Sequence, residues 1–108
     1  MNKNLLDIQN QLFENIDDLE IIMAQGGPIS EAHIEDGDHL LVDVNRKAEH
    51  ENIIAIDAGD EIYIKRLFIH GDKIDLIPHN EADDIPPFNT LDDLNIYGVI
   101  TWVIKKMV

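Results

Sequence analysis

The chain alternates short apolar segments with polar turns over most of its length, and this pattern predicts a mainly β fold. The apolar segments end at clusters rich in glycine, proline, asparagine and aspartate, which are typical boundaries of strands. The expected strands cover residues 19–24, 39–44, 53–56, 61–69, 74–77 and 95–104. We expect the first of them to be largely buried, and about seven short strands in all to form a sandwich or an open barrel.

The N-terminal segment has a different periodicity. Leu5, Ile8, Leu12 and Ile16 recur at helical spacing, so residues 4–14 are predicted to form one short amphipathic helix that caps the core.

Length and composition limit the class of protein. With 108 residues and a hydrophobic fraction of 44%, the chain is expected to fold as a single domain over residues 1–108. It contains no cysteine, and no apolar run approaches the roughly 20 residues that span a bilayer. The polar interruptions near the N-terminus do not fit a signal peptide. We therefore expect a soluble, cytoplasmic protein without membrane association.

The charge is strongly acidic, with 22 Asp and Glu against 8 Lys and Arg, for a formal net charge of -14. Such a surface repels phosphate backbones, so broad, direct nucleic-acid binding is not expected. Basic protein surfaces are attracted to it. An alternative on charge alone is a DNA mimic, whose binding to a basic protein would collapse with modest added salt.

Four segments carry a resemblance to a known family. They are an Asp-Gly-Asp turn before an apolar strand (36–44), a strand bearing a lysine followed by Arg-Leu (61–67), an apolar strand ending in Leu-Ile-Pro-His-Asn (74–80), and a closing strand (94–103). In order and spacing they resemble the LexA/UmuD family of self-cleaving serine peptidases, and within it most closely the processed form of UmuD. The resemblance implies the LexA/signal-peptidase-like fold.

The resemblance also assigns roles to positions. In active relatives a buried lysine takes the proton from a serine, which attacks a peptide bond of the protein's own N-terminal arm. Lys65 matches that lysine, whereas Pro28 stands at the position of the serine, about eight residues before Asp36. Proline offers neither a hydroxyl group nor a backbone N–H. Only Met1–Asn4 precede the predicted helix, which leaves almost no arm to cut, so we expect a pseudo-enzyme.

One alternative keeps the enzyme active. Ser30 lies two residues after Pro28, and a Ser30–Lys65 dyad would make the chain a peptidase. That assignment shortens the spacing to Asp36 and places Glu31 beside the serine, and a turn or helix-capping serine is the other interpretation.

The resemblance to processed UmuD implies a function in the DNA-damage (SOS) response. We expect a homodimeric accessory subunit of an error-prone translesion DNA polymerase, which also meets the recombinase filament. Tyr97 and Trp102 on the last strand are the expected dimer interface. The alternative is a regulatory pseudo-protease that pairs with an active LexA/UmuD-type protein or a phage repressor.

No cofactor or metal is expected. His33, Asp36, Asp38 and His39 are spaced irregularly around a turn, and histidines beside acidic residues are common on an acidic surface.

Overall fold

The computed structural model describes residues 19–24, 33–78 and 91–107. The predicted helix at residues 4–14 lies outside these described residues, as do Pro28 and Ser30.

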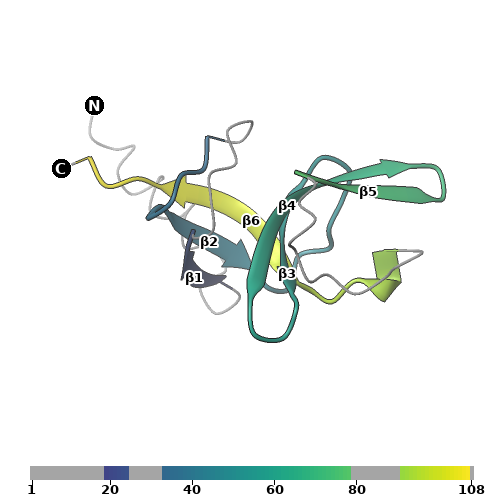
Figure 1. The fold of residues 1–108 in the computed structure, drawn as a ribbon, viewed down its shortest axis with the longest axis horizontal. Coiled ribbons are helices and arrows are strands. Elements are labelled where there is room, and N and C mark those ends of the chain that lie inside the picture. Colours follow the sequence, from purple (N-terminus) through teal and green to yellow (C-terminus); the bar gives the residue numbers. More distant parts are fainter. Residues whose placement is uncertain (1–18, 25–32, 79–90, 108) are drawn as a thin grey trace, which may run out of the picture.

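The described residues form six antiparallel strands and one short 3-10 helix (Figure 1). The elements are β1 (Leu19–Met23), β2 (His39–Asp43), β3 (Ile53–Asp57), β4 (Ile62–His70), β5 (Lys73–Ile77), η3 (Leu91–Asp93) and β6 (Ile96–Ile104). The expectation of a mainly β fold is confirmed, and the observed strand ends lie within about two residues of the predicted ones.

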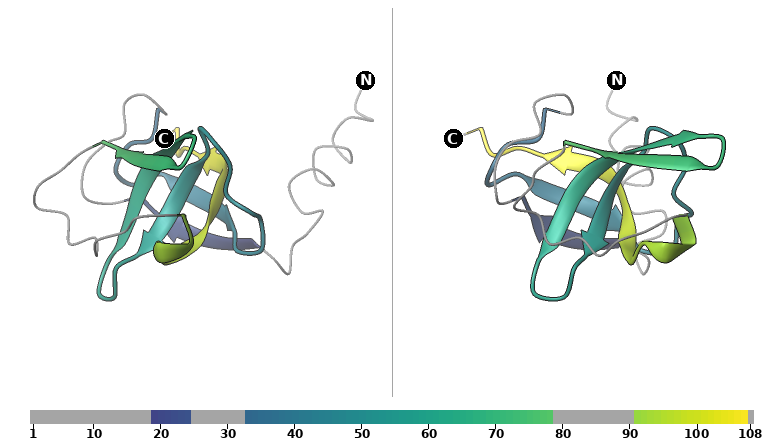
Figure 2. Two further views of the ribbon diagram at one scale, coloured as in Figure 1. Left: turned by 90° about the vertical axis from the view of Figure 1, so that its right-hand side faces the viewer. Right: turned by 45° about the vertical axis from the view of Figure 1, so that its right-hand side comes forward.

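All six strands belong to one sheet in the order β1-β2-β6-β3-β4-β5. The last strand therefore lies between β2 and β3 and pairs with both of them. Register shifts interrupt both pairings of β6, one between Leu41 and Val42 and the other between Ala55 and Ile56. Such bulges increase the local twist of a strand, and β1 and β2 run at a steep angle to β3 and β4 (Figure 2).

Tight turns connect β3 to β4 and β4 to β5. Gly59 adopts a φ of 93° in the first of these turns, a conformation that glycine reaches without steric cost. The Asp57 carboxylate accepts a hydrogen bond from the backbone N–H of Gly59 at 2.9 Å, and this side-chain contact closes the turn.

Apolar side chains pack on both faces of the sheet. Ile54 on β3 lies opposite Lys65 and Val99, so these three side chains share one face, and Ile53 points to the other. The core on the first face consists of Ala48, Ile54, Ile56, Leu67, Leu76, Leu94 and Val99. The core on the second face consists of Ala24, Ile34 and Leu40, with Ile22, Ile53, Ile64, Ile100 and Val103 packed against it.

The prediction that the first strand is largely buried was wrong. Ile21 and Met23 on β1 are 63% and 51% exposed. Within the described residues β1 pairs only with β2, so it forms an edge of the sheet, and the side chains on one of its faces have no neighbouring layer.

No helix in the described parts of the chain is long and apolar enough to cross a membrane.

Candidate functional site

Hydrogen bonds and burial fix the positions of the residues on either side of the segment that contains Pro28 and Ser30. Ala24 directly precedes this segment, and its backbone N–H donates to the carbonyl of Asp38 at 2.8 Å. The N–H of Gly37 donates back to the carbonyl of Ala24 at 2.9 Å. Ala24 and Ile34 are both buried in the second core. The Asp-Gly-Asp turn thus ties the two ends of the segment to each other and to the core.

Lys65 is the predicted site residue that the structure does describe. It lies on β4 and is only 5% exposed, although it carries an amine. Its Nζ donates a hydrogen bond to the carbonyl of Pro78 at 2.5 Å, just after the end of β5. Strand alternation places Lys65 on the face of Leu67 and opposite Ile54, beside the first core.

A buried amine needs polar partners, because the transfer of an amine from water into an apolar environment is costly. The carbonyl of Pro78 supplies one such partner. Lys65 therefore links β4 to the residue that follows β5, thirteen positions later in the chain. The buried amine of Lys65 thus serves as a structural link between β4 and the end of β5.

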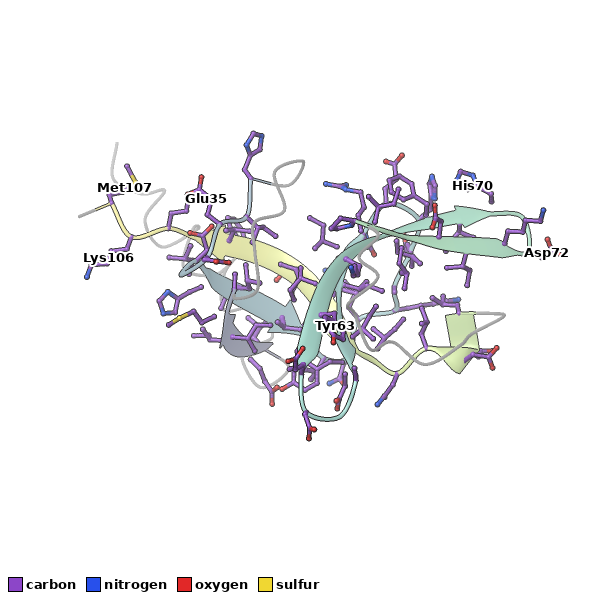
Figure 3. The ribbon with its side chains drawn as sticks, viewed as in Figure 1. Glu35, Tyr63, His70, Asp72, Lys106 and Met107 are labelled. Atoms are coloured by element: carbon purple, nitrogen blue, oxygen red, sulfur yellow. The ribbon has the colours of Figure 1, made fainter. Side chains whose placement is uncertain are left out.

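An ion pair fastens the Asp-Gly-Asp turn to the end of β6. Nζ of Lys105 lies 2.5 Å from Oδ2 of Asp38, whose side chain is 9% exposed. The same carboxylate oxygen accepts a hydrogen bond from the backbone N–H of Glu35 at 2.9 Å. The hydrogen bond from Lys105 lowers the pKa of Asp38 most, the N–H of Glu35 lowers it further, and partial desolvation opposes both effects. Figure 3 shows Glu35 near the end of β6 that continues to Lys106.

Sequence reasoning missed this ion pair. Asp38 was interpreted as a turn residue that does not bind a metal, and no prediction was made for Lys105. The two positions are 67 residues apart, and no local pattern in the sequence pairs them. Within the described residues, no group of three or more histidine or acidic side chains gathers around a common point that could hold a metal ion.

The backbones of β6 and β2 approach each other closely at Gly98. A Cβ atom at this position would lie 2.5 Å from Cγ1 of Val42 and 2.7 Å from the carbonyl oxygen of Asp43. Both distances are shorter than van der Waals contact, so only glycine fits here without a shift of β2.

The structure does not bring the two predicted interface aromatics together. Trp102 lies near the C-terminal end of β6 and is 41% exposed. Tyr97 is half-buried near the other end of the strand, at the register shift opposite Ala55 and Ile56. Trp102 instead lies in a row of apolar side chains on other strands, of which Leu41 is buried and Ile21 is exposed. It faces Leu41 of β2, which in turn faces Ile21 of β1.

A second row of exposed side chains runs parallel to this one. Met23 on β1 pairs with His39 of β2, which pairs with Ile104 of β6, and Ile104 is 46% exposed. Ile21 and Met23 of β1 and Trp102 and Ile104 of β6 lie on the same side of the sheet, on either side of Leu41 and His39 of β2, and we call these four residues the apolar face. The sequence of residues 19–23 already indicated an exposed apolar surface, because apolar residues occupy both faces of that strand.

Comparison with known proteins places these features in context. The profile of the Peptidase S24-like family matches residues 2–101. A LexA repressor from Desulfatibacillum aliphaticivorans is 28% identical over 111 residues, which cover 94% of this chain and 51% of the repressor. A LexA repressor from Acidovorax sp. is 34% identical over 99 residues, which cover 92% of this chain and 44% of the repressor. The chain thus spans about half the length of these relatives.

Proposed function

Because the chain belongs to the Peptidase S24-like family, we propose that it is a proteolytically inactive member that works as a binding module. Its role is that of a dimeric accessory subunit of an error-prone translesion DNA polymerase in the DNA-damage (SOS) response. We infer the inactivity from the residues at two positions of the candidate site, Pro28 and Lys65. Pro28 stands where the nucleophile is expected, while Lys65 is buried and bound to the carbonyl of Pro78.

A lysine without a nucleophile still has a structural use. Lys65 satisfies a carbonyl at the end of β5 and fills space beside the first core. This use accounts for a lysine at a buried position in a chain that has no hydroxyl group at residue 28.

Two surface properties support a binding role. The net charge of -14 attracts basic faces, such as those of a polymerase or of a recombinase filament. The apolar face around Trp102 offers exposed hydrophobic area of the kind that protein interfaces use, and it is the part of β6 that we assign to the homodimer.

The polymerase role is tested by affinity capture. A tagged chain is expressed in its host, DNA damage is induced, and the captured proteins are identified by mass spectrometry. Recovery of a translesion polymerase catalytic subunit or of the recombinase supports the proposal. The Trp102→Asp variant serves as the matched control for capture that depends on the apolar face.

The inactivity is tested separately with a fluorophosphonate probe that labels nucleophilic serines. The expected result is no labelling of the wild-type chain. Labelling that disappears in both the Ser30→Ala and the Lys65→Met variants would establish the Ser30–Lys65 dyad and overturn the proposal.

A second candidate function follows from the relatives, two of which are LexA repressors that align with 92% or more of this chain. In this case the inactive domain pairs with an active protein of the LexA type and slows its self-cleavage. The test adds the purified chain to a self-cleaving LexA-type repressor in the presence of activated recombinase. A lower cleavage rate, together with a mixed dimer in native mass spectrometry, favours this function over the polymerase role.

A further inference from the structure

The turn that leads into β3 also binds the C-terminal half of β4. The backbone N–H of Leu67 donates to the carbonyl of Asn52 at 2.8 Å, and the N–H of Glu51 donates to the carbonyl of Leu67 at 2.6 Å. The hydrogen bonds between β3 and β4 therefore continue past Ile53, the first residue of β3.

The backbone turns away from β4 at Glu51. This residue adopts a φ of 70°, in the left-handed region that residues other than glycine seldom occupy. The N–H of Asn52 donates to the carbonyl of Glu49 at 3.0 Å, and the N–H of Glu49 donates to Oδ1 of Asn52 at 2.8 Å, so the turn is closed. Strand geometry points the N–H of Ile69 to the same side of β4 as the N–H of Leu67, and this donor needs an acceptor beyond the turn.

The imidazole of His50 is that acceptor. Nδ1 of His50 accepts a hydrogen bond from the backbone N–H of Ile69 at 2.8 Å. An N–H donates only to a ring nitrogen that carries a lone pair, so the ring is neutral and its proton is on Nε2. Nε2 lies 3.5 Å from Oε1 of Glu51. The ring also packs on Phe68, with 5.9 Å between the ring centroids and an angle of 74° between the planes.

We propose that His50 is an acid-sensitive latch, in which a second proton on the ring breaks the hydrogen bond to Ile69 and moves the ring from β4 toward Glu51. An ordinary histidine changes its charge between about pH 5 and pH 8. The protonated ring carries an N–H at both nitrogens, so Nδ1 becomes a donor that faces the donor of Ile69. Two facing donors repel each other. The side chain of His50 is 45% exposed, which leaves the ring room to turn.

The charges around the ring favour this movement. The carboxylate of Glu51 attracts a protonated ring, and its side chain is 64% exposed and free to follow the ring. The ring of His70, near the turn between β4 and β5 (Figure 3), lies 5.6 Å from that of His50 between centroids, so two protonated rings repel each other. Three more charged side chains share this side of β4 and β5, namely Arg66, whose Nη1 donates to the carbonyl of Glu51, and Asp75 and Lys73, which lie opposite Phe68 and His70.

The two states of the latch differ at the C-terminal end of β4. In both states the turn keeps its backbone hydrogen bonds to Leu67, because neither partner titrates. In acid the N–H of Ile69 and the part of Phe68 that His50 contacts become accessible to water. The latch therefore loosens one end of a strand and exposes an aromatic side chain while the sheet stays folded. This inference requires no partner and does not rest on the proposed function.

Amide hydrogen exchange and nitrogen NMR of the isotope-labelled chain test the latch. At about pH 7.5 we expect the Nε2–H tautomer of His50 and a protected N–H at Ile69. At about pH 5 we expect a doubly protonated ring, and a protection factor of Ile69 that is lower by about fivefold or more, as for the loss of one hydrogen bond. Protection factors correct for the intrinsic effect of pH on exchange.

Leu67 is the internal control, because its N–H bonds to the backbone carbonyl of Asn52. Its protection factor is expected to stay unchanged, and an equal fall at Leu67 and Ile69 would count against a local latch. Equal protection of Ile69 at both pH values, or an Nδ1–H tautomer of His50 at neutral pH, would overturn the proposal.

Variants at position 50 separate the acceptor from its titration. In His50→Asn the amide oxygen stands close to the place of Nδ1 and accepts at either pH, so Ile69 is expected to be equally protected in both conditions. His50→Ala removes the acceptor, and Ile69 is expected to be poorly protected in both. His70→Gln is the matched control that removes a neighbouring titrating ring, and the pH dependence at Ile69 should persist in it. A loss of protection in acid in His50→Asn, or its disappearance in His70→Gln, would assign the change to another group and refute the proposal.

Discussion

Substitution of Lys65 by alanine and by methionine separates a structural role of this residue from a role in partner binding. Lys65→Ala removes three methylene groups from a nearly buried position, worth about 2 to 3 kcal/mol in lost burial. It also removes the donor to the carbonyl of Pro78, and a partly buried carbonyl that loses its donor costs about 1 to 3 kcal/mol. We expect the free energy of unfolding to fall by about 3 to 5 kcal/mol.

Lys65→Met keeps most of the volume and removes only the amine. The lost hydrogen bond is offset because no ammonium group has to be buried, so we expect the methionine variant to unfold within about 1 kcal/mol of the wild-type chain. Thermal melts followed by circular dichroism are the assay. The alanine variant should melt more than about 10 °C below the methionine variant.

A partner-capture assay on the Lys65→Met variant completes this test. The methionine variant is expected to capture the same partners as the wild-type chain, because Lys65 lies inside the fold and not on the surface. Two results would refute the reasoning. Equal destabilisation by alanine and methionine would show that the amine, and not the filled space, holds the structure. A stable methionine variant that captures no partner would give the amine a direct function.

Two further predictions concern the sheet and its ion pair. Gly98→Ala should destabilise the chain by about 1 to 3 kcal/mol or more, because the new methyl group meets the backbone of β2 at Asp43, and chemical denaturation measures this loss. Asp38→Asn should destabilise the chain at neutral pH, where the carboxylate binds Lys105, and the difference from the wild type should shrink as the pH falls below about 4. The direction of this pH dependence follows from the lowered pKa of Asp38 in the folded chain. The ionised carboxylate stabilises the fold above the pKa of the unfolded state, and this stabilisation is lost as the pH falls through the folded pKa. A gap between Asp38→Asn and wild type that stays constant down to pH 2 would contradict this assignment.

Local sequence features predicted most of the fold. Alternating apolar residues located all six described strands, and turn residues such as Gly59 located the hairpins. The order of the strands did not follow from the sequence pattern, since the pairing of β6 with β2 joins residues some 60 positions apart. Local propensity carries no information about such long-range contacts, and the resemblance to a family supplied the fold name instead.

The assignment of the candidate site residues stays a prediction. The structure describes Lys65 as a buried lysine, whereas Pro28 and Ser30 lie outside the described residues. The exposure of Ile21 and the ion pair of Asp38 were both missed. Each depends on which strand lies at the edge of the sheet or on which distant side chain arrives beside a turn, and both are properties of the assembled sheet.

The position of β6 in the centre of the sheet has a consequence for the order in which the protein folds. A chain that emerges from the ribosome presents β1 and β2 first and then the β3–β4–β5 meander. Among the strands that the structure describes, only β6 joins these two groups. Until residue 104 has been synthesised, β2 and β3 each expose an unpaired edge, and such edges are prone to associate with other chains. The sheet therefore closes only after β6 has been synthesised, and folding depends on the insertion of this strand between β2 and β3.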